Sequence, residues 1–481
     1  MKYTICFILL CTSAQVYAQV IIDAVPNYFG VDTNHKIIVW NQSHLDSVPF
    51  DKNAAVDIRF NNEVYHLTTL GAPLKQNARY QLIKQSDTFK LYISSFPIIN
   101  IKSDDSIVNE PKINAKISYA DYVLNIESDI GIELRGNSAL HYPKKSYDME
   151  LREEATSEKS KDAKLASLRK DDDWQLNSMF NEPLKLRSYF ANKLWLDIHT
   201  PFYSEDKKKA KSGIDLAYSE VFLNNTYQGL YSLNEQVDRK QLRLKKIDSL
   251  GKVQGELFKA SSYQDNTSFK AAPSYRNIFP HFGGFSVKYP YENYEAHWED
   301  LHAFVNFVAT ADNVSFSAEI EQRFYIDNAI DYFLLTNLLR ATDNLGKNYF
   351  LARYKKDSPY FFVPWDLDGI LGIIQDGKRI STTDDILSNN LFDRLKETNA
   401  ANYNERLNAR WIELRSEAFS NSALEEKLHN YYHKFTESGL YERESMVWPQ
   451  EIPREDDYQY MMSWLEKRLE YLDTYLSLIH I

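Results

Sequence analysis

The chain has 481 residues, of which 43% are hydrophobic and 14% aromatic, and its formal net charge at pH 7 is −11. This length and apolar content allow about three domains of roughly 150 residues each and exclude a globally disordered protein. The acidic balance argues against a general nucleic-acid binder, whose surface is usually basic, so we expect no nucleic acid among the partners.

Residues 1–18 have the features of a secretory signal peptide. Lys2 gives a positive start, Ile5–Leu10 form a short apolar run, and Val16–Ala18 resemble a cleavage site. The run is too short to cross a membrane as a helix, and no later run is long enough, so we expect no transmembrane segment. Both cysteines lie inside this segment, which leaves the rest of the chain without disulfides or thiolate metal sites. We therefore expect a protein that is secreted, periplasmic or located at the surface of a bacterial cell.

Residues 19–108 are predicted to form an N-terminal β-rich accessory domain. Short, often alternating runs such as KIIVW and FKLYISSF are separated by Asn, Asp, Gly and Pro, at spacings typical of a small β-sandwich. No combination of residues in this region points to catalysis.

Residues 109–260 continue the β-rich pattern and include one helix. YVLNIESDIGIELRGNSAL and KKSYDMELRE predict two strands joined by a Gly-containing turn, and an Asn-Asn pair within 213–239 predicts a hairpin. EPLKLRSYFANKLWLDI has the periodicity of an amphipathic helix. From 261 to 481 helical patterns dominate, over 295–341 and most of 404–481. The chain is therefore predicted to be α+β, with the β structure first.

One two-stranded insertion interrupts the helical part, and acidic and amide residues stand at its ends. Residues 325–341 predict a buried helix that ends at the loop sequence TDNLGKN. The runs YFLARY and YFFVPW then predict a hairpin, with Asn348 at the start of the first strand and Asp366 at the end of the second. A hairpin brings these two ends together, so we expect Asn348 and Asp366 to be neighbours. Asp343 lies in the loop just before them.

This arrangement suits a site for a metal ion and a phosphate. Mg²⁺ prefers oxygen ligands and is usually held by one or two protein groups plus substrate phosphates. Asn348 and Asp366 supply such oxygens, and Asp343 can accept the proton of an attacking hydroxyl or orient it. The order helix, Asp-x4-Asn loop, hairpin and Asp is also that of protein-kinase catalytic loops. Each residue alone has a structural alternative, as a strand-end cap or an Asx turn.

Five stretches of the sequence match one known family in the family's own order. They are LRGNSALHYPKKSYDMEL (134–151), DDDWQLNSMFNEPLKLRSYFANKL (171–194), YSEVFLNNTYQGLYSLNEQVDR (218–239), DNLGKNYFL (343–351) and VPWDLDGILG (363–372). On these stretches the chain resembles the CotH kinase family, the spore-coat protein H type of secreted atypical kinase. The resemblance implies a divergent protein-kinase-like fold in two lobes, with 109–260 as the β-rich N-lobe and 261–481 as the helical C-lobe.

The resemblance also implies phosphate transfer from ATP to Ser or Thr of a protein substrate, with Mg²⁺ or Mn²⁺. Asp343 matches the catalytic-loop aspartate, and Asn348 matches the metal-binding asparagine of that loop. Asp366 matches the metal-binding aspartate that opens Asp-Phe-Gly in ordinary kinases. This chain has Asp-Leu-Asp-Gly instead, which adds Asp368 as a further candidate metal ligand. The nucleotide and an unidentified protein are the expected partners, and the protein itself is expected to be a monomer.

A lysine that holds the nucleotide phosphates is expected in PKKSYDMEL. Strand alternation places Lys145 on the apolar face with Tyr147 and Leu151, where an unpaired ammonium needs a partner or a ligand. Lys145 is therefore the candidate, and the alternative is an edge lysine whose charged end reaches water. Arg135 lies in the preceding turn, where a loop covering the phosphates would lie, although no Gly-x-Gly-x-x-Gly is present. Glu235 is a candidate contact to the adenine or to Lys145.

Two other functions stay open at this point. A non-catalytic surface protein of the same fold could bind a protein or a glycan, and it would show no stabilisation by nucleotide. A metal-dependent phosphoester hydrolase could use the same carboxylates, but the histidines of the chain are scattered and predict no two-metal cluster. No motif identifies the acceptor.

Overall fold

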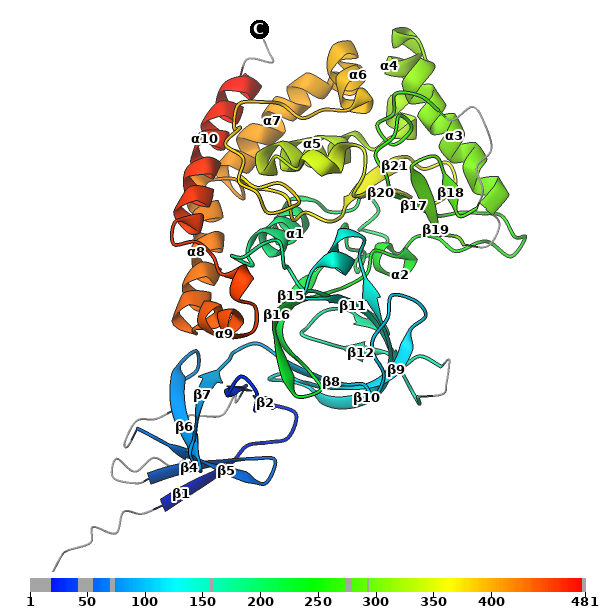
Figure 1. Ribbon diagram of the computed structural model, residues 1–481. Coiled ribbons are helices and arrows are strands. Elements are labelled where there is room, and N and C mark those ends of the chain that lie inside the picture. Colours follow the sequence, from blue (N-terminus) through cyan, green and yellow to red (C-terminus); the bar gives the residue numbers. More distant parts are fainter. Residues whose placement is uncertain are drawn as a thin grey trace, which may run out of the picture.

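The computed structural model describes residues 19–41, 55–69, 74–155, 159–272, 279–291 and 294–477. The predicted signal peptide, residues 1–18, lies outside them. The chain is a mixed α+β structure in which an N-terminal sheet, a closed β-barrel and a C-terminal part of sheet and helices follow one another (Figure 1). None of the described helices is both long enough and apolar enough to cross a membrane.

The described N-terminal strands form one seven-stranded sheet, where the strand spacing had predicted a sandwich of two. Its core includes Trp40, Ile58, Leu82 and Leu91, all fully buried. Parallel pairings add β1 and the β2–β3 hairpin to the two edges of the antiparallel β4–β7 meander, so all these strands join a single sheet. In sheet order the strands are β1 (Gln19–Asp23), β4 (Ala55–Phe60), β5 (Glu63–Leu67), β6 (Arg79–Lys84), β7 (Asp87–Ile93), β3 (Ile37–Trp40) and β2 (Phe29–Asp32).

A closed seven-stranded barrel follows, filled by alternating side chains such as Ile132, Met149, Trp174 and Tyr231. One of its strands, β8, pairs with both β9 and β15, although the predicted boundary at residue 108 left it in the N-terminal domain. Alternation within a strand does not reveal its partners, and here barrel closure decides them. Around the barrel the strands are β10 (Asn125–Arg135), β11 (Ser146–Arg152), β14 (Asp173–Asn177), β16 (Thr226–Asn234), β15 (Leu216–Leu223), β8 (Ile98–Lys102) and β9 (Ile113–Ala120).

The C-terminal part combines a five-stranded sheet with most of the helices (Figure 1). The helical patterns predicted over 295–341 and most of 404–481 are confirmed, up to Ser477, by α3–α5 and α7–α10. In sheet order the strands are β18 (His281–Phe282), β19 (Phe285–Tyr289), β17 (Glu256–Ala260), β20 (Tyr349–Arg353) and β21 (Tyr360–Pro364). The helices are α1 (Arg187–Ile198), α2 (Arg239–Leu242), α3 (Tyr294–Thr310), α4 (Asn313–Arg323), α5 (Ile326–Leu339), α6 (Asn390–Thr398), α7 (Tyr403–Ser416), α8 (Asn421–Glu437), α9 (Leu440–Val447) and α10 (Asp457–Ser477).

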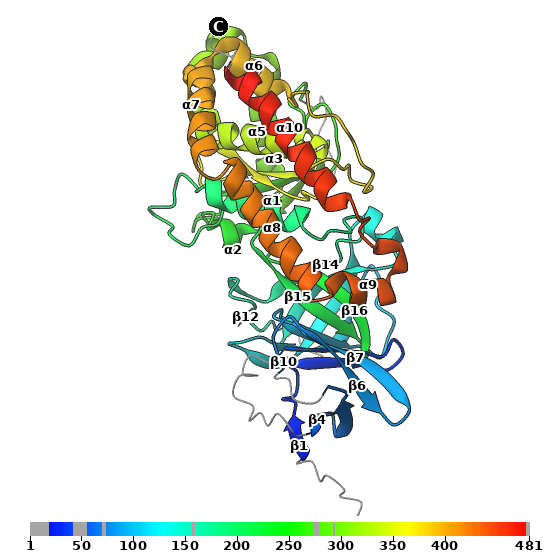
Figure 2. The same ribbon diagram turned by 90° about the vertical axis from the view of Figure 1, so that its left-hand side faces the viewer.

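Helix α9 lies between the three parts of the molecule (Figures 1 and 2). Three consecutive charged residues, Glu442–Glu444, each pair with a different segment of the chain. Glu442 binds Arg79 and Lys90 of the N-terminal sheet, each at 2.7 Å. The next two residues pair with Glu220 on β15 and with Lys144 just before β11. The C-terminal helices are thereby held to both β structures. The two-lobed, kinase-like arrangement that the family resemblance implies remains a prediction.

Candidate functional site

The predicted hairpin is present and buried. β20 and β21 pair antiparallel, with Tyr349 opposite Pro364, and every residue of both strands is buried. Helix α5 fixes the outer strand, because the Asn328 amide accepts from the Phe362 N–H at 2.6 Å and donates to the Phe362 carbonyl at 3.0 Å. The apolar helix and the two aromatic strands thus form a rigid base for the loops at the hairpin ends.

Asn348 and Asp366 lie together at the open end of this hairpin, as the strand order predicted. The Trp365 N–H donates to the Asn348 carbonyl at 3.1 Å. Both residues have left-handed backbones, with φ of 58° at Asn348 and 56° at Asp366. Such backbones are uncommon outside glycine, although Asn and Asp tolerate them best, and they are enriched at functional sites.

Asn344, which the sequence reading did not single out, holds these two backbones in place. Its Nδ2 donates to the carbonyls of Asn348 and Trp365, at 2.7 Å each. Its own carbonyl accepts from the Tyr332 hydroxyl at 2.7 Å. The side chain is almost fully buried, so it acts as a clamp that fixes the relative position of the two strand ends.

Asp343 begins this loop, within the short 3₁₀ helix Thr342–Leu345. Its Oδ2 lies 2.7 Å from Nζ of Lys347, and both side chains are partly exposed. The carboxylate therefore faces solvent and carries one cationic neighbour. That exposure leaves it accessible to a reacting hydroxyl.

A pocket of about 430 Å³ brings most of the predicted site residues together. Its lining includes Asp343, Asn348, Asp366 and Asp368 from the C-terminal part and Arg135 from the end of β10. The turn after Arg135 forms the barrel side of the pocket. The site therefore lies where the barrel meets the C-terminal sheet, and groups from both contribute to it.

Asp368 and Asp366 place two carboxylates on the same wall. Asn181 Nδ2 donates to Asp368 Oδ2 at 2.8 Å and to the Gln375 carbonyl at 2.7 Å. Burial and the nearby negative charge of Asp366 raise the pKa of Asp368 above its usual range. Two carboxylates that disfavour each other's charge are stabilised by a cation between them, and oxygen ligands suit Mg²⁺ or Mn²⁺.

Two cations face these acids. Arg135 and Lys259 both lie beside the Trp365 ring, with Cζ of Arg135 5.8 Å and Nζ of Lys259 4.9 Å from its centroid. Burial lowers the pKa of both, and that of Lys259 falls to about 8. Within the described residues, neither forms an ion pair with a carboxylate. Lys259 was missed in the sequence, although a lone lysine in the strand ELFKA was a usable signal.

Lys145 is not brought to this pocket. Its Nζ donates to the Leu140 carbonyl at 2.7 Å, and its side chain is only half-buried. The neighbouring Lys144 is the fully buried lysine, with Nζ 2.8 Å from the Leu230 carbonyl and 3.0 Å from Glu444 Oε1. Strand alternation failed here because β11 begins at Ser146, so both lysines precede the strand.

Glu235 also lies elsewhere. It is fully buried at the end of β16, where its carboxylate accepts from the Arg169 N–H, from Lys211 Nζ and from Gln241 Nε2. These contacts occupy both carboxylate oxygens. In the described part of the chain, Glu235 does not line the pocket, and Lys145 is not one of its hydrogen-bond partners.

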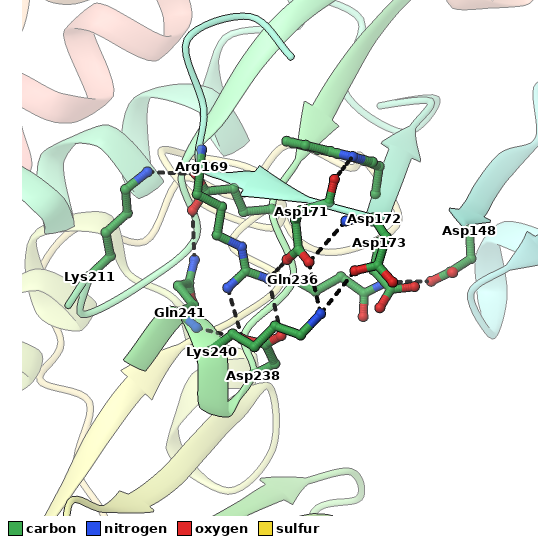
Figure 3. A network of polar contacts seen from close by, with 12 residues as sticks. Asp148, Arg169, Asp171, Asp172, Asp173, Lys211, Gln236, Asp238, Lys240 and Gln241 are labelled. Carbon is green, nitrogen blue, oxygen red and sulfur yellow. Dashed lines mark hydrogen bonds and ion pairs between the residues drawn. The ribbon is translucent and has the colours of Figure 1, made fainter. Parts of the chain in front are cut away.

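A second acidic cluster is already paired with cationic side chains. Carboxylate oxygens of Asp162, Asp171 and Asp172 lie within 4.8 Å of one another. Lys240 Nζ lies 3.1 Å from Asp171 and 2.9 Å from Asp172, and Arg169 forms an ion pair with Asp171. Figure 3 shows both cationic side chains directed into this group. The cluster therefore links the segment just before β14 to α2 through ion pairs.

Comparison with known proteins places most of the chain in one family. A protein-family model described as "CotH kinase protein" matches residues 132–472. The match contains every predicted site residue and also α9, and it leaves the N-terminal sheet outside. No curated protein matches the sequence.

Proposed function

From the premise that the chain belongs to the CotH kinase family, we propose that it is an ATP-dependent phosphotransferase that modifies Ser or Thr of a protein. The observation that supports this most is the composition of the pocket. Oxygen ligands on one wall face two cations for which the described residues provide no carboxylate partner, and a metal-bound polyphosphate needs this charge layout.

The oxygen donors fit a divalent cation. Asn348, Asp366 and Asp368 would hold Mg²⁺ or Mn²⁺, and Asn344 fixes the backbone of Asn348 and of Trp365, the residue before Asp366. When bound, the metal would neutralise charge on the β- and γ-phosphates. Burial and the charge of Asp366 raise the pKa of Asp368, and a cation bound at this wall would offset that unfavourable charge.

Asp343 is the group proposed to act on the acceptor. Its carboxylate would orient a Ser or Thr hydroxyl and take its proton while the hydroxyl oxygen forms a bond to the γ-phosphorus. The bond between the γ-phosphorus and the bridging oxygen breaks, and its electron pair leaves with ADP. Lys347 Nζ lies 2.7 Å from Asp343 Oδ2 and would help to hold this carboxylate in position for the acceptor hydroxyl.

We also propose that the protein acts outside the cytoplasm after removal of residues 1–18. Sequencing the N-terminus of the protein recovered from cell fractions tests this. A mature chain that begins at Gln19 in the exported fraction is the expected result, and an intact Met1 terminus would contradict it.

Thermal melting of the purified mature protein tests the nucleotide site. We expect ATP with Mg²⁺ or Mn²⁺ to raise the melting temperature, because a ligand that binds only the folded state stabilises it by about 2.7 kcal/mol at 100 times its Kd. The rise should vanish in Asp366→Ala and persist in Glu426→Ala, which removes an exposed acid on α8. A folded wild type that shows no shift with either metal would contradict the proposal and favour a non-catalytic binding protein.

A further inference from the structure

Lys259 holds an unusual position for a lysine. β17 is the central strand of its sheet, and Lys259 lies opposite Ser286 on one neighbour and Phe350 on the other. The residues on either side of it, Phe258 and Ala260, are buried in the main hydrophobic core. Nζ of Lys259 lies over the rings of Phe350 and Trp365, 6.0 and 4.9 Å from their centroids, and Lys259 is among the residues that line the pocket. Its ammonium therefore ends in the pocket.

Enclosing an ammonium without a counter-ion is unfavourable; Lys144, which is fully buried, shows how this chain compensates for it, and Lys259 is partly buried. Burial lowers the pKa of both lysines to about 8. Lys144 is compensated by Glu444 and by the Leu230 carbonyl. In the part of the chain that the structure describes, Lys259 has no such ion pair or hydrogen bond. The charge of Asp366 attracts it, while Arg135 and Lys288 repel it.

Arg135 approaches the same tryptophan from the barrel. It ends β10, and the turn that follows passes through Gly136, whose φ is +110°. A Cβ at Gly136 would lie 2.7 Å from the Ala139 Cβ, so the turn is compact and holds the arginine at the rim of the pocket. Two cations from different parts of the chain thus lie close together beside the acids. They repel each other, and a bound anion would offset this repulsion.

We propose that Lys259 and Arg135 form the polyphosphate-binding pair of this site, with Lys259 in the place predicted for Lys145. The inference rests on the proposed function and names the groups that bind its nucleotide. Because Arg135 belongs to the barrel and Lys259 to the C-terminal sheet, a bound polyphosphate would connect the two. A nucleoside monophosphate lacks the β- and γ-phosphates, so its binding affinity should depend little on Lys259 and Arg135.

Binding of ATP, AMP and inorganic tripolyphosphate, each with Mg²⁺, tests the assignment by titration calorimetry. Lys259→Met keeps the packing of the stem and should weaken ATP and tripolyphosphate binding at least about tenfold, with AMP changed less than about twofold. Lys259→Arg should recover most of the affinity. Arg135→Gln should resemble Lys259→Met, and it tests the pair from the barrel side if the β17 variant does not fold. Lys145→Met is the matched control and should bind like the wild type.

The outcomes separate this inference from the proposed function. A wild type that binds ATP while Lys259→Met binds it equally well would overturn the assignment of Lys259 and leave the phosphotransferase proposal standing. Loss of ATP binding in Lys145→Met, with Lys259→Met unaffected, would restore the lysine predicted from the sequence. A wild type that binds neither ATP nor tripolyphosphate would overturn both proposals together.

Discussion

The buried pair of Lys144 and Glu444 gives a prediction whose size follows from the structure. The Lys144 side chain is fully buried and that of Glu444 is 2% exposed, with 3.0 Å between Nζ and Oε1. Glu444→Gln removes the counter-ion and leaves the ammonium inside the protein. Removing one member of such a pair costs about 3–5 kcal/mol of unfolding free energy. We expect a loss in this range, reduced to the extent that Lys144 sheds its proton.

Urea unfolding followed by circular dichroism measures this loss in a double-mutant cycle. Lys144→Met alone should also destabilise, because it leaves the Glu444 carboxylate buried. The double variant should lose much less than the sum of the two single variants, by about 2 kcal/mol or more. Glu442→Gln on the same helix is the control, and as a partly exposed group it should cost at most about 1 kcal/mol. Strictly additive losses at Lys144 and Glu444 would refute the reasoning.

Three further predictions concern the site and the core beneath it. Asn344→Ala should lower the rate of phosphotransfer, because it releases both strand ends that the Asn344 amide holds. Unchanged activity in this variant would contradict the clamp. Burial raises the pKa of Glu256 to about 7, so its contribution to stability is present at pH 4.5 and lost as the pH rises through 7. Glu256→Gln should therefore gain stability relative to the wild type between pH 5 and 7.5, and a constant difference in urea unfolding would contradict this. Chelation of divalent metal by EDTA should abolish the thermal shift with ATP, and a shift that survives would exclude the proposed ligand set.

The sequence predicted the features that depend on residues close together along the chain, such as hairpins and turns. The helix–loop–hairpin order fixed the meeting of Asn348 and Asp366, because a hairpin is closed by its own turn. The Asn224–Asn225 turn, with both residues at positive φ, was predictable for the same reason. Arg135 and Lys259 were not predictable as a pair, since they stand 124 positions apart and meet only when the barrel packs on the C-terminal sheet.

The same limit explains why Lys145 and Glu235, which the sequence suggested as nucleotide contacts, lie away from the pocket. Alternation identifies the faces of a strand only within the strand, and Lys144 and Lys145 precede β11. The partner of Lys144 lies 300 positions away, on a helix whose own pattern does not reveal which surface it contacts. Glu235 was assigned from its place at a strand end, and the Lys211 that neutralises it comes from a loop.

The position of α9 sets an order on how the molecule can assemble. Lys144 and Glu220 occupy fully buried positions of the barrel, and their charge partners are residues 444 and 443. A nascent chain has made every strand of the barrel by residue 234, yet these two charges lack their ion-pair partners on α9 until more than 200 further residues have been synthesised. The barrel therefore reaches its final stability only when almost the whole chain exists, and a chain cut short before α9 would retain a loosened barrel open to proteases.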